Sequence, residues 1–190
     1  PRCLRRGSFF NNGFLHFAPG TLVMIEDFGE SAIFRNEGYL IGSPIIEGGT
    51  VINNGIIAPG ESPGTMIVNG GFIQETGGEL LIELGGSVPG VDYDQLVVNG
   101  TATLGGCLRL ISLEESFPAD GTTYMPVVAT TLVGQFDEII YDVASGRQMF
   151  DVVIGETGVT ASAMTLDVST FAAWQAGVFT ADEQADENIS

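Results

Sequence analysis

The sequence contains no lysine. Its 190 residues include six arginines against 24 aspartates and glutamates, which gives a formal net charge of −18. Three of the arginines, Arg2, Arg5 and Arg6, lie within the first six positions, so the remainder of the chain is still more acidic. Such a surface repels phosphate groups, and the composition therefore excludes binding to nucleic acid or to an anionic membrane.

Cysteine and long apolar runs are also scarce. The two cysteines, Cys3 and Cys107, lie too far apart to form a metal or redox motif, and we expect both to be unpaired. No uninterrupted apolar run reaches the length of about 18 residues that indicates a membrane-spanning helix. We therefore expect no cofactor, no bound metal and no membrane insertion by this chain.

Histidine is limited to His16, in the apolar segment Phe14–Phe17. A single histidine cannot supply both a general base and a set of metal ligands, so a structural or incidental role is expected. The paired glycines are not followed by the lysine or the helix that a phosphate-binding loop requires.

Polysaccharide cleavage requires two carboxyl groups about 5 to 9.5 Å apart. Glu79 and Glu83 lie on one face of a predicted strand but about 13 Å apart along it, which is too far. Asp92 and Asp94 are about 6.6 Å apart on an extended backbone and are the candidate pair for glycoside cleavage or for a shared calcium ion. We expect instead that they form a turn at the entry to a strand.

Other charged groups offer little chemistry. The body of the chain contains only Arg35, Arg109 and Arg147 as bases for a lyase reaction. The acidic residues near the C-terminus lack the Asp-x-Asp-x-Asp-Gly spacing of a calcium loop and are expected to form a solvent-exposed helix face. They are Asp182, Glu183, Asp186 and Glu187. No catalytic, cofactor-binding or metal-binding residue is predicted.

Glycine is abundant, with 27 residues, and the remaining composition favours short strands and tight turns. A weak repeat of Asn and Gly followed by apolar residues has glycines at positions 13, 38, 55, 70 and 100. A unit this short cannot bury its own apolar face, which favours a stacked β-solenoid over the alternative of a hairpin-based sandwich or barrel.

The alternation in residues 79–84, 96–98 and 108–110 predicts strands with one buried face. We expect residues 50–110 to form stacked parallel strands. The side chains expected to face inward are Leu80, Ile82, Leu84, Leu96, Val98, Leu108 and Leu110.

The predicted organisation has four parts. Residues 1–10 form a ragged start that belongs loosely, if at all, to the fold, and residues 11–110 form the solenoid. Residues 111–168 form a β-rich cap, and residues 169–190 form a short helical linker. The linker's aromatic side chains are expected to dock onto the cap: Phe171, Trp174 and Phe179.

An ordered series of segments resembles the passenger β-helix of autotransporter-type bacterial surface proteins. These segments are Gly55–Gly60, Ser62–Gly70, Gly77–Leu84, Tyr93–Gly100 and Ala102–Gly106. The series is similar in particular to variants that carry a PEP-CTERM-type sorting signal. The resemblance covers about residues 50–165. It implies a right-handed parallel β-helix, export, and display outside the cell or at its surface.

The sequence therefore predicts a non-enzymatic structural or adhesin-like module that acts as a stalk or display scaffold. An extracellular glycan or surface protein is the expected class of partner. Two alternatives remain: a carbohydrate-active β-helix that uses Asp92 and Asp94, and a binding module with an aromatic patch. The patch would consist of Phe9, Phe10, Phe14 and Phe17.

Overall fold

The structure is a computed structural model that describes residues 2–5, 8–26, 32–113, 118–142 and 148–165. These residues form strands and no helix, so the expected all-β class is confirmed. The expected helical segment 169–190, with its acidic run, lies outside the described residues.

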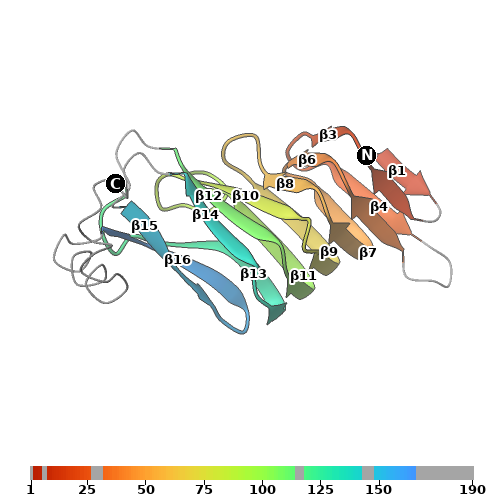
Figure 1. Ribbon diagram of the computed structural model, residues 1–190. Coiled ribbons are helices and arrows are strands. Elements are labelled where there is room, and N and C mark those ends of the chain that lie inside the picture. Colours follow the sequence, from red (N-terminus) through yellow and green to blue (C-terminus); the bar gives the residue numbers. More distant parts are fainter. Residues whose placement is uncertain (1, 6–7, 27–31, 114–117, 143–147, 166–190) are drawn as a thin grey trace, which may run out of the picture.

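The strands form two sheets that face each other (Figure 1). Most strands of the larger sheet follow the order β1 (Arg2–Arg5), β4 (Leu22–Glu26), β7 (Ile45–Asn53), β9 (Thr65–Gln74), β11 (Gln95–Leu104), β13 (Thr123–Gly134), β16 (Gly158–Thr165) and β15 (Gln148–Ile154). Beside β7, this sheet continues through β5 (Ile33–Asn36) to β2 (Phe9–Asn11). The smaller sheet has the order β14 (Glu138–Asp142), β12 (Cys107–Ser112), β10 (Glu79–Leu84), β8 (Ile56–Pro59), β6 (Tyr39–Gly42) and β3 (Phe14–Phe17).

Successive segments of the chain repeat one arrangement of strands. Each contributes to the larger sheet first and then to the smaller sheet, and pairs in parallel with the segment before it. We number these segments repeat 1 to repeat 6: residues 2–17, 22–42, 45–59, 65–84, 95–112 and 123–142. The expectation of stacked parallel strands over residues 50–110 is confirmed. The larger sheet is mixed, because β16 pairs antiparallel with both β13 and β15.

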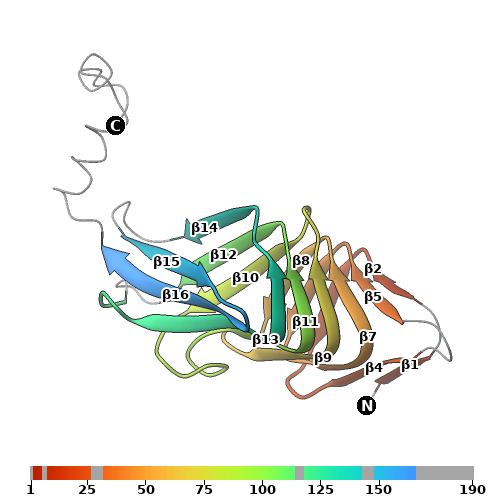
Figure 2. The same ribbon diagram turned by 90° about the horizontal axis from the view of Figure 1, so that it is seen from below.

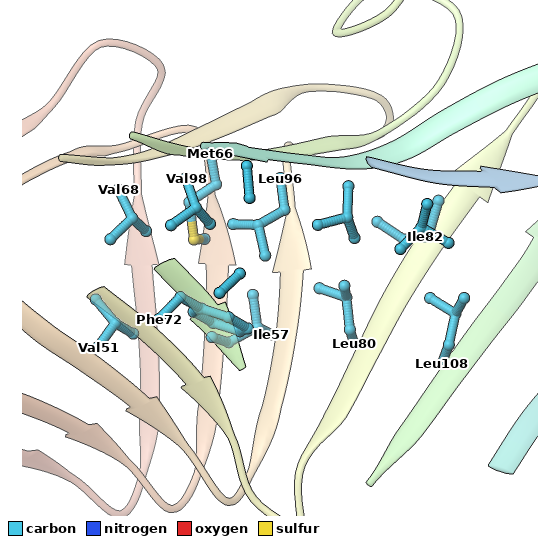
Figure 3. Close-up of a cluster of buried hydrophobic side chains, with 14 of the residues drawn as sticks. Val51, Ile57, Met66, Val68, Phe72, Leu80, Ile82, Leu96, Val98 and Leu108 are labelled. Atoms are coloured by element: carbon cyan, nitrogen blue, oxygen red, sulfur yellow. The ribbon is translucent and has the colours of Figure 1, made fainter. Parts of the chain in front are cut away.

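The core lies between the two sheets (Figure 3). In β10 every second residue is fully buried, and Leu80 and Ile82 are opposite Leu108 and Leu110 of β12 in register. All seven side chains expected to face inward are at most 1% exposed. Burial of each large aliphatic side chain contributes about 1.5–3 kcal/mol, so these inward rows are the main source of stability.

Two columns of glycine mark two different corners of the repeats. At the first, a Cβ on Gly38 would lie 2.1 Å from the Gly13 carbonyl oxygen, and one on Gly55 would lie 2.2 Å from that of Gly38. At the second, a Cβ on Gly100 would lie 2.2 Å from the carbonyl oxygen of Gly70. Backbones at both corners therefore approach too closely for any side chain.

These columns correct the repeat that the sequence suggested. Gly13, Gly38 and Gly55 do occupy equivalent places, but Gly70 and Gly100 belong to the other corner, in the middle of β9 and β11. The sequence pattern joined the two corners because both combine Asn with Gly.

A ladder of buried amides follows the first corner. Asn11 donates from Nδ2 to Oδ1 of Asn36 (2.7 Å), Asn36 donates to Oδ1 of Asn53 (2.9 Å), and Asn53 donates to Oε1 of Gln74 (3.2 Å). The three steps span 25, 17 and 21 residues of sequence. We name these four residues the amide ladder. Its side chains also donate to backbone carbonyls, such as Tyr39 O from Asn11, which satisfies buried polar groups that would otherwise be costly.

The last described strands close the stack differently. The antiparallel strands β15 and β16 lie against β13 of repeat 6 (Figure 2). Phe150 of β15 is fully buried and contacts the rings of Tyr124 and Tyr141, with centroids 6.0 and 6.2 Å away. The Tyr124 hydroxyl also donates to the Gly85 carbonyl at 2.7 Å, so a hydrogen bond connects this end to the residue that follows repeat 4.

Strand pairing extends beyond both ends of the range 11–110 that was expected to form stacked strands. At the start, Arg2–Arg5 and Phe9–Asn11 pair with β4 and β5, so these parts of residues 1–10 belong to the sheet. At the other end, parallel pairing passes residue 110 and continues through β13 and β14. Repeat 6 was not predicted because Gly134 takes the position that Asn occupies in repeats 1 to 3.

Candidate functional site

Asp92 and Asp94, the candidate carboxylate pair, lie in the connection between β10 and β11. Asp94 is 1% exposed, and its two oxygens accept hydrogen bonds from the backbone N–H groups of Gly64 (2.8 Å) and Glu83 (3.0 Å). Asp92 accepts from the N–H of Val88 at 2.9 Å. Both carboxylates thus accept hydrogen bonds from backbone N–H groups around the turn that leads into β11.

The environment of Asp94 disfavours its charged form. Burial raises the pKa of Asp94 to about 7, although the amides of Glu83 and Gly64 offset part of this effect. A raised pKa together with burial is also typical of catalytic acids. Here, however, the buried carboxyl group connects the backbone at Gly64 and at Glu83 to the turn that contains Asp94, an arrangement that supports a structural role.

Glu79 and Glu83 lie on the outer face of β10, as expected. Glu79 accepts a hydrogen bond from Arg109 Nε at 2.9 Å, whereas the backbone N–H of Glu83 donates to Asp94. The contact of Glu83 with Asp94 is therefore made by its backbone and not by its carboxylate, and no hydrogen bond among the described residues combines the two glutamate side chains into one site.

His16 lies on the exposed face of β3, although its sequence neighbours are apolar. Its Nε2 contacts Oε1 of Glu61, and both side chains are about half exposed, at 46% and 47%. Glu61 was not identified from the sequence, because it follows 45 residues later, in the connection between β8 and β9.

The expected aromatic patch is divided by the sheet. Phe17 is buried, and Phe9 packs against Phe34 with ring centroids 4.9 Å apart. Phe10 and Phe14 are 61% and 70% exposed. Phe14 of β3 lies opposite Tyr39 of β6 in the strand register. The centroids of these two rings are 6.4 Å apart, with an interplanar angle of 32°. Only part of the predicted patch is therefore available to a ligand, and Tyr39 adds to it.

An open groove of about 310 Å³ runs beside the larger sheet, where the turns between the sheets stack. Its walls contain no charged or aromatic side chain. They are formed by Pro19, Gly20, Ser43, Ile45, Pro63, Gly64, Thr65, Ile67 and Gly90. The groove offers van der Waals contact and backbone hydrogen bonds but no acid, base or nucleophile other than a serine and a threonine hydroxyl.

Two arginines connect acidic side chains of different repeats. Arg35 binds both oxygens of Glu75, at 2.9 and 2.6 Å, and also contacts Glu37. Arg109 lies between Glu79 at 2.9 Å and Asp142 at 3.2 Å. Hydrogen bonds to these carboxylates raise the pKa of both guanidinium groups. In a chain this acidic, each arginine offsets repulsion between stacked carboxylates, which the sequence did not predict because the partners are distant along the chain.

Cys107 is a free, half-buried thiol on β12. Burial and the nearby Glu79 and Glu138 raise the pKa of this thiol, so it is a poor nucleophile. The side chain of Cys3 lies outside the described part of the structure. Within the described residues no cluster of three or more His, Cys, Asp or Glu side chains is arranged to hold a metal ion.

The described part of the chain also contains no helix with the length and apolarity needed to cross a lipid bilayer. Comparisons with protein-family models, curated proteins and solved structures gave no match.

Proposed function

We propose that this chain is a non-enzymatic structural module, a right-handed parallel β-helix that serves as a stalk or display scaffold outside a bacterial cell. The observation that carries the proposal is the parallel register of the six repeats together with the amide ladder that connects repeats 1 to 4. Connections between parallel strands of one sheet are right-handed in nearly all proteins, which supports the handedness.

Stacked repeats suit a spacer because each repeat contacts its neighbours and length grows by repetition. The six repeats advance by one strand spacing at a time, about 4.8 Å. The acidic, lysine-free surface supports a soluble, weakly adhesive module. The resemblance to autotransporter-type passenger modules with a PEP-CTERM-type tail supports display outside the cell. Antibodies against the chain should label intact source cells, and labelling only after lysis would contradict this location.

The absence of catalysis is tested directly. The purified chain, incubated with neutral and acidic polysaccharides, should release no new reducing ends or unsaturated sugars. Turnover that Asp94→Asn abolishes, in a variant still folded by circular dichroism, would overturn the proposal. Asp137→Asn is the matched control, because this carboxylate also accepts a hydrogen bond from a backbone N–H, that of Gly106 at 2.7 Å, and does not belong to the candidate pair.

A second candidate function, glycan binding, is favoured by one observation: Phe14 and Tyr39 lie side by side and exposed on the smaller sheet. Exposed aromatic faces bind apolar ligand surfaces, and the acidic protein disfavours anionic sugars. A glycan array should then show binding to neutral sugars that Phe14→Ala removes and Val153→Ala, an exposed change on β15, leaves intact. An array without signal would leave the scaffold role as the sole proposal.

A further inference from the structure

The second halves of four long strands form a regular outer face on the flank of the larger sheet. They are residues 50–53 of β7, 71–74 of β9, 101–104 of β11 and 131–134 of β13. Neighbouring halves pair in parallel and in register. Side chains alternate along each of the middle two, and Phe72 and Ala102 are fully buried in the core. The residues on either side of these two therefore point away from the core.

The outward residues form two columns that run along the stack. In one column Ile73 lies opposite both Ile52 and Thr103, and Thr103 lies opposite Val133. In the other column Thr50 lies opposite Gly71, and Thr101 lies opposite Thr131. We name these eight residues the threonine face.

The threonine face carries no charged and no aromatic side chain, although the chain has a net charge of −18. The outer face of the smaller sheet, by contrast, bears ionised groups such as Glu79 and Arg109. At the border of the threonine face, Arg35 lies opposite Ile52 and binds Glu75 at 2.9 and 2.6 Å, so these two charges offset each other. Such a composition favours an uncharged partner.

The face is also stiff and evenly spaced. Apart from Gly71, every member is Ile, Val or Thr, and branching at Cβ restricts the χ1 angle of these side chains. Members of one column are separated by the strand spacing of about 4.8 Å, and the two columns by two residues of strand, about 6.7 Å. Hydroxyl and methyl groups are thus held in a two-dimensional array, and little side-chain entropy is lost when a ligand binds.

The dimensions of the face argue against the commoner kinds of partner. Two columns across four strands cover about 250 Å², whereas a specific protein interface buries about 800 Å² on each partner. Sugar rings bind against aromatic side chains, and this face has none. Further repeats at either end of the stack would lengthen the columns and leave the flank open.

We propose that the threonine face binds ice. Its hydroxyl groups hydrogen-bond to water molecules, and its methyl groups order the water that lies between them. The two spacings of the array are similar to repeat distances of the oxygen atoms on a prism face of hexagonal ice. A flat lattice of uncharged molecules complements a flat, uncharged and periodic protein surface. This activity goes beyond the scaffold role and does not depend on it.

The test uses the purified full chain and a single ice crystal held just below its melting point. The crystal should develop facets and should stop growing over a measurable interval of temperature, the thermal hysteresis. Thr101→Tyr places a large ring at an exposed position within the face and should reduce this interval at least tenfold. Its thermal melting curve should match that of the native chain, because the change lies on the outer side of β11.

A matched pair of variants separates the face from the rest of the surface. Val133 is 50% exposed within the face, and Val153 is 55% exposed on β15, outside it. Val133→Tyr should reduce the thermal hysteresis severalfold, whereas Val153→Tyr should leave it unchanged. Ice growth unaffected by the native chain, or an equal loss in Val153→Tyr, would overturn the proposal. Adsorption to crystalline cellulose in place of ice, or a dimer that Thr101→Tyr dissociates, would also overturn it.

Discussion

Repeats 1 to 4 and repeats 5 and 6 fill the same corner in different ways. The early repeats place Asn or Gln there, and side-chain amides connect one repeat to the next. The late repeats place Leu104 and Gly134 there, and the chain then relies on an antiparallel pair of strands and an aromatic cluster. Side-chain hydrogen bonds thus connect the stacked strands at this corner in repeats 1 to 4, whereas apolar packing stabilises repeats 5 and 6.

The strongest disruption should come where the two regions meet. Ile82 of repeat 4 is fully buried opposite Leu110. Ile82→Asp places an unpaired charge between stacked strands and should cost more than about 4 kcal/mol of unfolding free energy. Glu83→Ala, on the outer face of the same strand, should change it by about 0.5 kcal/mol or less. Similar thermal melts of the two variants would show that the faces are assigned wrongly.

The aromatic region is tested by Phe150→Ala. The ring is fully buried between Tyr124 and Tyr141, so its removal leaves a cavity and should cost about 3–5 kcal/mol. Hydrogen exchange should accelerate first in β15 and β16, while the amide-ladder strands keep their protection. Uniform loss of protection along the chain would mean that the two regions unfold as one unit.

The turn between the regions should give stability a dependence on pH. Because the pKa of Asp94 is raised to about 7 in the folded state and is about 3.9 when unfolded, the folded state holds this proton more tightly. Its contribution is complete below pH 4 and is lost as the pH rises to 7, by up to about 4 kcal/mol. Chemical denaturation of the native chain and of Asp94→Asn at several pH values measures the difference, which should shrink as the pH rises. A pH-independent difference would contradict the raised pKa.

The amide ladder is tested by Asn36→Leu. This change removes the Asn36 amide as a donor to Asn53 Oδ1 and to the Ile56 carbonyl, and it also removes the Asn36 Oδ1 acceptor of Asn11 Nδ2. The expected cost is about 2–3 kcal/mol, smaller than that of Phe150→Ala, with faster exchange confined to repeats 1 to 3. An unfolding free energy within error of the native value would mean that the ladder contributes little to stacking.

The sequence predicted the elements that depend on local alternation. The inward-facing side chains of β10, β11 and β12 were predicted from the alternation of apolar and polar residues, because successive side chains of a strand point to opposite faces of the sheet. Parallel stacking over residues 50–110 followed from the short glycine-marked unit. The two glycine corners could not be separated, because Asn precedes Gly closely at both: as Asn-x-Gly at the ladder corner and as Asn-Gly at the bend within β9 and β11.

Features that depend on distant partners were not predictable. The Arg35 bridge to Glu75 spans 40 residues, and the His16 contact with Glu61 spans 45. Asp92 and Asp94 were expected to form a turn, and both accept hydrogen bonds from backbone N–H groups. The burial of Asp94 could not be predicted from the sequence. Phe9 and Phe17 were grouped with Phe10 and Phe14 because composition alone does not tell which side of an edge strand a ring faces.

The amide ladder also has a consequence for chemical ageing. Asn followed by Gly is the step most prone to deamidation, in which the glycine nitrogen attacks the side-chain carbonyl of Asn and releases ammonia. At Asn54-Gly55 the attacking N–H is directed to Oδ1 of Asn53, and at Asn12-Gly13 it is directed to Oδ1 of Asn11. The ladder therefore holds both nucleophiles away from the adjacent amide, and these two steps should deamidate more slowly in the folded chain than in the denatured chain, as mass spectrometry of aged samples would reveal. The same asparagines that connect the repeats thus lengthen the chemical lifetime of the corners beside them.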